Sequence, residues 1–187
     1  MRIISGRSKG RKIHEPKDLN TRPLKDLTKE SIFNILTHSN KFVIKLKNSN
    51  VLDLFSGVGS FGLECLSREV SNVTFVENYD NVLPVLKKNI LDLDYQENSL
   101  VIENDIFNNL DLIIFKKKFD IIFMDPPYKE KKITTLLNKI IQSDILSNDG
   151  IIIIHRHKKE TDKFPERFNI IEEKTYGISK VIFGNYL

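Results

Sequence analysis

The sequence predicts an α/β fold in which a mostly parallel, seven-stranded sheet carries an antiparallel hairpin at one edge. From residue 50 onward, short apolar runs alternate with segments of helical periodicity, which is typical of repeated β-α-β units. The run at residues 119–124 is rich in apolar, β-branched and aromatic side chains, as expected for a buried strand of a parallel sheet. Near the C-terminus, two strand-like segments follow each other across a short turn that contains a glycine, which indicates a hairpin.

A small basic element is expected in front of this domain. Residues 1–16 are interpreted as a short hairpin or arm, because glycines interrupt brief apolar stretches that are surrounded by cations. Apolar residues then recur at helical spacing over residues 25–37, which predicts a helix packed over one end of the sheet. We therefore divide the chain into a basic N-terminal element, residues 1–40, and a main domain, residues 41–187.

The main domain is expected to contain its elements in regular alternation. A turn at residues 176–179 is expected to join the last two strands, and residues 106–115 carry no clear pattern. The expected strands cover residues 50–55, 73–77, 100–103, 119–124, 150–155, 167–175 and 180–186, and the expected helices cover residues 60–67, 81–92 and 131–143.

A glycine-rich turn follows the first strand of the main domain. Gly57 and Gly59 permit a tight turn and the close approach of a ligand, and the helix that follows offers free N–H groups. With Gly62 and with Glu77 about 20 residues after the first glycine, the pattern also matches the dinucleotide fingerprint. An NAD-dependent oxidoreductase is therefore one alternative.

Asp53 favours a different cofactor. It lies in the strand just before the turn. A carboxylate at this position can accept a hydrogen bond from an ammonium group, but it offers no favourable contact to a pyrophosphate. S-adenosylmethionine combines an amino-acid tail, a ribose and an adenine, so we expect Asp53 and the glycine turn to hold the methionine part and Glu77 the ribose. The expected cofactor-binding residues are Asp53, Phe55, Gly57, Gly59, Glu77, Asn104 and Asp105, of which the last two would reach the adenine amino group.

The Asp125-Pro126-Pro127-Tyr128 motif follows the strand at residues 119–124. Neither proline can donate a ladder hydrogen bond, so the chain leaves the sheet in an extended conformation at its carboxyl edge, where open α/β sheets bind ligands. The carboxylate of Asp125 and the carbonyl of Pro126 can both accept hydrogen bonds from one planar amino group, while the ring of Tyr128 stacks on its plane. We interpret the motif as the catalytic clamp for an exocyclic amine; the alternative is a strand end whose Asp caps a turn and whose Tyr packs.

Positive charge is concentrated near the N-terminus. The chain has 29 basic and 25 acidic side chains, a net charge of +4. Residues 1–30 hold nine basic and four acidic side chains, a balance of +5, so the remainder of the chain carries −1. A local basic patch indicates a polyanionic partner. The side chains expected to contact RNA are Arg7, Lys9, Arg11, Lys12 and Arg22.

Other features narrow the class of protein. Cys65 is the single cysteine, which excludes an intramolecular disulfide and a cysteine-ligated zinc site and fits a cytoplasmic location. No apolar run is long enough to span a bilayer, so no membrane contact is expected. His155 and His157 have no evident third ligand nearby in the sequence, so no metal is expected, and His155 is interpreted as a strand-end histidine with solvated neighbours.

The order of these motifs resembles that of Rossmann-like, class I S-adenosylmethionine-dependent methyltransferases that act on amino groups. Five segments narrow the resemblance to the bacterial RsmD family, which the chain resembles from Met1 to Tyr186. They are Arg2-Ile-Ile-Ser-Gly, Gly10-Arg-Lys, Thr21-Arg-Pro, Lys29-Glu-Ser-Ile-Phe-Asn-Ile-Leu and Gly62-Leu-Glu-Cys-Leu-Ser-Arg. The resemblance implies methylation of the N2 of one guanine in 16S ribosomal RNA, within the small ribosomal subunit or its assembly intermediate, by a monomeric enzyme.

The chain departs from the family pattern at two places. Leu27 stands where the family usually has Arg, and His155-Arg156-His157 replaces a stretch that more often carries a carboxylate. The alternatives are an amino-methyltransferase that acts on another nucleic-acid base or on a protein glutamine, the NAD-dependent oxidoreductase, and an RNA-binding assembly factor without enzymatic activity.

Overall fold

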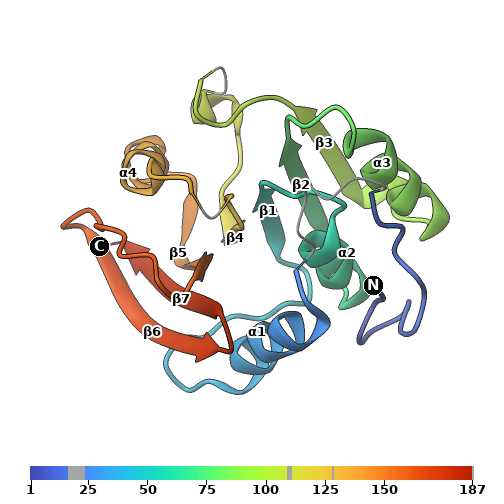
Figure 1. The fold of residues 1–187 in the computed structure, drawn as a ribbon, viewed down its shortest axis with the longest axis horizontal. Coiled ribbons are helices and arrows are strands. Elements are labelled where there is room, and N and C mark those ends of the chain that lie inside the picture. The colour runs from blue at the N-terminus through green and yellow to red at the C-terminus, as the bar shows by residue number, and fades with distance from the viewer. Residues whose placement is uncertain (17–23, 109–110, 128, 187) are drawn as a thin grey trace.

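The computed structural model describes residues 1–16, 24–108, 111–127 and 129–186. One seven-stranded sheet has the order β3-β2-β1-β4-β5-β7-β6, in which neighbours from β3 to β5 are parallel and β7 is antiparallel to both β5 and β6 (Figure 1). The strands are β1 (Asn50–Leu54), β2 (Asn72–Glu77), β3 (Ser99–Glu103), β4 (Phe119–Met124), β5 (Leu146–His157), β6 (Phe168–Tyr176) and β7 (Ser179–Tyr186). The helices are α1 (Asp26–His38), α2 (Ser60–Ser67), α3 (Leu83–Asp92) and α4 (Ile133–Ser143), with short 3-10 turns at Gln96–Asn98 and Leu112–Ile114.

This architecture confirms the predicted fold class and the predicted edge hairpin. The main difference is β5, which begins at Leu146 instead of residue 150. Leu146 pairs with Phe119 and Ile151 pairs with Ile121, so the polar residues between them form an irregularity within the pairing. The sequence pattern placed the start of this strand at residue 150, but pairing with β4 extends it to Leu146. The segment without a clear pattern, residues 106–115, contains the 3-10 turn at Leu112–Ile114.

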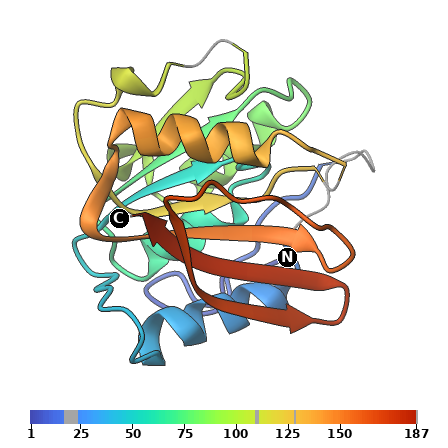
Figure 2. The same ribbon diagram turned by 90° about the vertical axis from the view of Figure 1, so that its left-hand side faces the viewer.

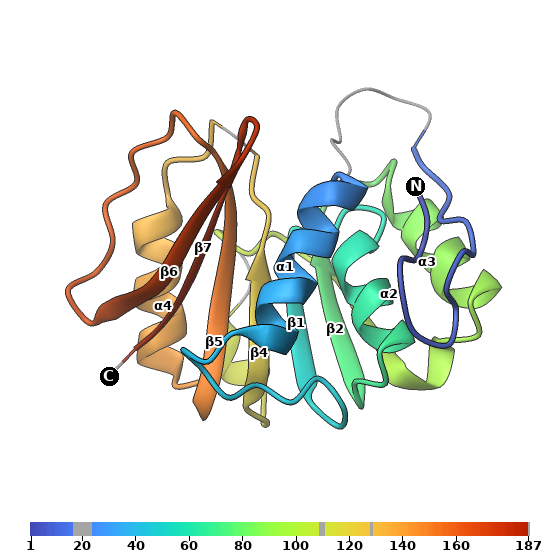
Figure 3. The same cartoon turned by 90° about the horizontal axis from the view of Figure 1, so that it is seen from below.

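Helices cover both faces of the sheet. Helices α1, α2 and α3 lie on one face (Figure 3), and α4 lies on the other, across the sheet from α1 (Figure 2). Successive residues of a strand point to opposite faces, so each strand contributes to both layers. Ile121 and Phe123 of β4 pack with the layer of α1 to α3, while Ile122 and Met124 pack with α4. This double burial explains why the central strands are apolar at nearly every position.

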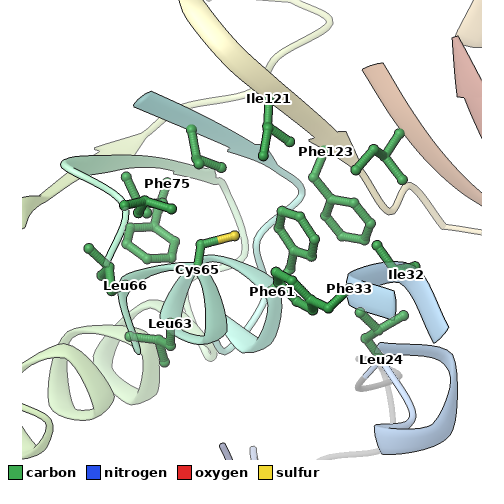
Figure 4. Close-up of a cluster of buried hydrophobic side chains, with 14 of the residues drawn as sticks. Leu24, Ile32, Phe33, Phe61, Leu63, Cys65, Leu66, Phe75, Ile121 and Phe123 are labelled. Atoms are coloured by element: carbon green, nitrogen blue, oxygen red, sulfur yellow. The ribbon is translucent and has the colours of Figure 1, made fainter. Parts of the chain in front are cut away.

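Three stacked aromatic rings join the N-terminal helix to the centre of the sheet (Figure 4). The ring centroids of Phe33 in α1 and Phe61 in α2 are 5.2 Å apart, and those of Phe61 and Phe123 in β4 are 4.0 Å apart. Phe61 lies in the first turn of α2, directly after the glycine-rich turn, and Phe123 lies two residues before Asp125. The stack therefore connects the N-terminal helix to both segments that carry candidate site residues.

Residues 1–16 form the predicted hairpin. Arg2 and Lys12 make an antiparallel bridge, and Ile3 and Ile13 are buried. Glu64 of α2 accepts hydrogen bonds from the backbone N–H groups of Ile4, at 2.7 Å, and of the residue that follows it, at 3.0 Å. The hairpin is thus fixed to α2, with its charged side chains directed outward. Across the described part of the chain, no helix has the length and apolar character needed to cross a membrane.

Candidate active site

A cavity of about 940 Å³ opens where the parallel strands end. The carboxyl ends of β1, β2 and β4 meet at one edge of the sheet because these strands are parallel neighbours. The lining comes from three parts of the chain: the glycine-rich turn with the end of β2, the ends of β4 and β5 with the β6–β7 turn, and the N-terminal element. The lining residues include Asp53, Phe55, Gly57, Glu77, Asp125 and His155.

Asp53 is buried at the floor of this cavity, with 1% of its surface exposed. Its Oδ2 accepts a hydrogen bond of 2.9 Å from the N–H of Gly62, whereas its Oδ1 has no hydrogen-bond partner among the described residues. Burial raises the pKa of Asp53 well above its usual range, the Gly62 N–H opposes the rise, and the charges of Asp125 and Glu77 add to it. A buried carboxylate with one unsatisfied oxygen is a site for a cationic hydrogen-bond donor.

The glycine-rich turn is held by Glu77. One carboxylate oxygen of Glu77 accepts from the N–H of Gly57 at 2.7 Å, and the other accepts from the N–H groups of Asn78 and Tyr79, both at 2.9 Å. Glu77 therefore has a structural role in addition to the expected ribose contact. Three of the roughly four lone-pair positions of a carboxylate are used, so one further donor can be accepted.

Gly57 leaves space for a ligand. Its φ of +55° lies in the left-handed region, and a Cβ built on it would have no protein atom within 4 Å. Phe55, at the start of the turn, has a φ of +61° and also lines the cavity. The open space at Gly57 and the unsatisfied Oδ1 of Asp53 are two independent features that fit the amino-acid end of S-adenosylmethionine.

Asn104 and Asp105 lie beyond the end of β3, outside the cavity lining. Oδ1 of Asp105 accepts from the N–H of Phe107 at 2.8 Å, and Oδ1 of Asn104 accepts from the N–H of Asp105 at 2.8 Å. Asp105 thus stabilises the turn that follows β3. Contact of either side chain with adenine stays a prediction.

The proposed clamp segment also lines the cavity. Asp125, Pro126 and Pro127 line it, and Tyr128 lies outside the described residues. Oδ1 of Asp125 is 2.7 Å from Nδ1 of His155. The carbonyl of Pro127 accepts a hydrogen bond of 3.3 Å from the guanidinium of Arg156. The structure therefore brings the Asp-Pro-Pro segment and the end of β5 together.

The interpretation of His155 as a residue with solvated neighbours is wrong. His155 is 5% exposed and lines the cavity, and the adjacent Arg156 is completely buried. Both were missed because their partners are distant in sequence. The pairing of Met124 with Ile154 sets residues 125 and 155 side by side at the sheet edge. The sequence offered one signal for this role: His155 ends the expected strand at residues 150–155, which lies next to the strand that precedes the Asp-Pro-Pro segment.

The basic side chains of the hairpin fall into two groups. The guanidinium of Arg7 lies 4.4 Å from the centre of the Tyr95 ring, and that of Arg11 donates to the backbone carbonyl of Asp92 at the end of α3. Lys9 and Lys12 are exposed. Arg22 lies outside the described residues. The hairpin thus presents cations beside α3, two of which are anchored there.

The strand order, the glycine-rich turn after β1 and the Asp-Pro-Pro segment after β4 define a class I methyltransferase, for which S-adenosylmethionine is the cofactor. The family described as Conserved hypothetical protein 95 matches residues 1–185, and the chain belongs to this family, the RsmD family.

Individual relatives are similar over nearly the whole chain. YlbH of Bacillus subtilis is 34% identical over 185 residues, which cover 97% of this chain and 96% of YlbH. Ribosomal RNA small subunit methyltransferase D of Haemophilus influenzae is 32% identical over 179 residues, which cover 95% of this chain and 90% of that protein. The solved structure of yhhF from Escherichia coli matches with a TM-score of 0.81 at 26% identity and covers 100% of this chain and 97% of its own.

Proposed function

We propose that this protein transfers a methyl group from S-adenosylmethionine to the exocyclic N2 amine of a guanine in small-subunit ribosomal RNA. The observation that carries the proposal is one cavity whose lining contains both the unsatisfied carboxylate oxygen of Asp53 and the carboxylate of Asp125. The names of relatives such as the Haemophilus influenzae enzyme support ribosomal RNA as the substrate class. Guanine N2 as the target rests on the resemblance to the RsmD family.

The cofactor end consists of Asp53, the glycine-rich turn and Glu77. Oδ1 of Asp53 would accept from the ammonium group of the methionine part, and the remaining acceptor position of Glu77 would bind a ribose hydroxyl. When bound, S-adenosylmethionine supplies a methyl group on a sulfonium, whose C–S bond breaks as the N–C bond forms and leaves neutral S-adenosylhomocysteine. Gly57 admits the ligand because no side chain occupies that space.

The substrate end orients the amine. Asp125 and the Pro126 carbonyl would accept the two amine hydrogens, which directs the nitrogen lone pair toward the methyl group, and Tyr128 would stack on the base. Catalysis then consists of positioning and of stabilising the positive charge that develops on nitrogen, whose proton leaves after transfer. A paired base must be flipped out of its helix to reach this cavity.

The N-terminal element, residues 1–40, would hold the RNA. Phosphate contacts position a protein on RNA without reading its sequence. We assign this role to Arg7, Lys9, Arg11, Lys12 and Arg22, and we expect a cytoplasmic monomer that acts on the small subunit or its assembly intermediate.

Replacement of the clamp carboxylate tests the proposal. Asp125→Ala should abolish transfer of labelled methyl to small-subunit RNA while S-adenosylhomocysteine binds as before, because Asp125 acts on the amine. Asp149→Ala, on the exposed part of β5, is the matched control. Retained transfer in Asp125→Ala would exclude the clamp, and binding of NAD in place of S-adenosylhomocysteine would identify the oxidoreductase.

A further inference from the structure

We propose that His155 is a positioning residue that fixes the carboxylate of Asp125 in the orientation needed to accept the substrate amine. The inference rests on the proposed function and assigns a role to a residue that the clamp motif does not contain. Its basis is the hydrogen bond of 2.7 Å between Nδ1 of His155 and Oδ1 of Asp125. The two residues are 30 positions apart in the sequence.

The chemistry of the pair determines the direction of this bond. An ionised carboxylate only accepts hydrogen bonds, so Nδ1 of His155 carries the proton and donates it. One oxygen of Asp125 is thereby occupied, and the other remains for a donor from the substrate. The carboxylate torsion of Asp is otherwise broad, so an unsupported Asp125 would sample many orientations.

His155 is rigidly held whereas Asp125 is not. His155 belongs to β5, which lies between β4 and β7, and it pairs with Val181 of β7. Asp125 has left its strand, and its own N–H makes only a long hydrogen bond of 3.4 Å to the carbonyl of Leu54. The side chain of His155 is 6% exposed and that of Asp125 is 18% exposed. The orientation of Asp125 is therefore transmitted from the sheet through His155.

Arg156 does not substitute for this contact. Its guanidinium makes two contacts to the carboxylate of Asp162, at 2.9 and 3.0 Å, and donates to the carbonyls of Pro127 and Glu130. Arg156 thus holds the backbone beyond the clamp, while His155 holds the carboxylate itself. Loss of His155 should change the chemical step and leave the loop in place.

Two isosteric substitutions separate positioning from filling of space. The amide of Asn can place a donor near the position of Nδ1, whereas the longer side chain of Gln places its amide near Nε2. His155→Gln should lower kcat about 10- to 100-fold, since misplacement of a catalytic group costs that much. His155→Asn should recover most of this loss. The KM for RNA and the affinity for S-adenosylhomocysteine should change less than about threefold in either variant, because the contact acts on orientation.

Rates are measured per S-adenosylhomocysteine-binding site, so a partly unfolded preparation does not lower kcat. His157→Gln, two residues further along β5 and outside the cavity lining, controls for a change of histidine in this strand. Wild-type kcat in His155→Gln, or equal loss in His155→Asn and His155→Gln, would overturn the inference while the proposed function stands. A wild-type protein that transfers no methyl group would instead overturn the proposed function, and the inference with it.

Discussion

At the scale of single residues, Asp53 shows how an unfavourable group indicates a binding site. Its burial disfavours the charged form, and one of its oxygens has no partner among the described residues. Because the folded-state pKa is raised, the protein without ligand loses stability as the pH rises from about 3.9 through that pKa. A cationic ligand reverses the effect by stabilising the carboxylate.

The affinity for S-adenosylhomocysteine should therefore depend on the ionisation of Asp53. Binding should strengthen as the pH rises through the raised pKa of Asp53, because only the carboxylate pairs with the ligand's ammonium group. Asp53→Asn should weaken binding roughly 10- to 100-fold, the effect of losing a charge-assisted hydrogen bond, and should abolish this pH dependence. Calorimetric titration of both proteins over a series of pH values above the ordinary pKa of Asp measures this dependence; equal affinities throughout would show that Asp53 does not contact the ligand.

Gly57 permits a second test with a matched control. Gly57→Ala and Gly177→Ala should each lower the free energy of unfolding by about 1–2 kcal/mol, because φ is +55° and +59° and neither Cβ meets a protein atom within 4 Å. Only Gly57 lines the cavity, so only Gly57→Ala should also weaken S-adenosylhomocysteine binding. Equal ligand affinity in the two variants, measured alongside urea unfolding, would place the ligand elsewhere.

Residue identity and spacing were sufficient to predict that Asp53, the glycine-rich turn, Glu77 and Asp125 lie together, since each lies in or near a strand end that the local pattern marks. His155 could not be found in this way. Its role depends on which strand lies next to β4, and that neighbour is set by long-range pairing. Likewise, the hydrogen bonds of Glu77 to the glycine-rich turn depend on the packing of β2 beside β1.

At the scale of elements, the end of β5 supports the clamp segment through Arg156. Its contacts to Asp162 and to the carbonyls of Pro127 and Glu130 need the planar fork of a guanidinium. Arg156→Lys keeps the charge but cannot make all of these bonds. It should lower the free energy of unfolding by about 1–3 kcal/mol and reduce kcat, because the clamp segment loses its attachment.

Urea unfolding and methyl-transfer kinetics of Arg156→Lys measure this effect, with the exposed Arg167→Lys as the control for the same chemical change. Identical stability and kcat in the two variants would show that the attachment is dispensable.

The positions of β6 and β7 in the sheet agree with the compositions of the two strands. The hairpin of β6 and β7 was predicted, and the structure places β7 inside and β6 at the edge. The composition explains this order, since β7 carries Val181, Ile182 and Phe183 in buried positions. In contrast, β6 carries Glu172, Glu173 and Lys174, and charged side chains protect an edge strand from further pairing.

At the scale of the whole molecule, the N-terminal hairpin extends from the cavity to the C-terminal ends of α2 and α3. The N-terminal hairpin contributes Met1 and Glu15 to the cavity lining and presents Lys9 and Lys12 to solvent. RNA that lies along the hairpin would therefore reach the cavity at the end formed by Met1 and Glu15. Arg7 and Arg11 also contact Tyr95 and the end of α3, so their replacement would change the packing of the hairpin as well as its charge.

The double variant Lys9→Gln, Lys12→Gln should weaken RNA binding and reduce the slope of log affinity against log salt by roughly 1 to 2, because phosphate contacts release counterions. The double variant Lys41→Gln, Lys47→Gln removes the same charge from the segment that precedes β1. Filter binding over a series of salt concentrations compares them. An unchanged slope for the first variant would exclude the hairpin lysines as phosphate contacts.

The most direct test of the proposed function is transfer of labelled methyl from S-adenosylmethionine to small ribosomal subunits that lack their own methylation, followed by digestion and separation of the nucleosides. We expect label in N2-methylguanosine from small-subunit RNA. Label in another nucleoside or in protein glutamine, or no label in any fraction, would contradict it.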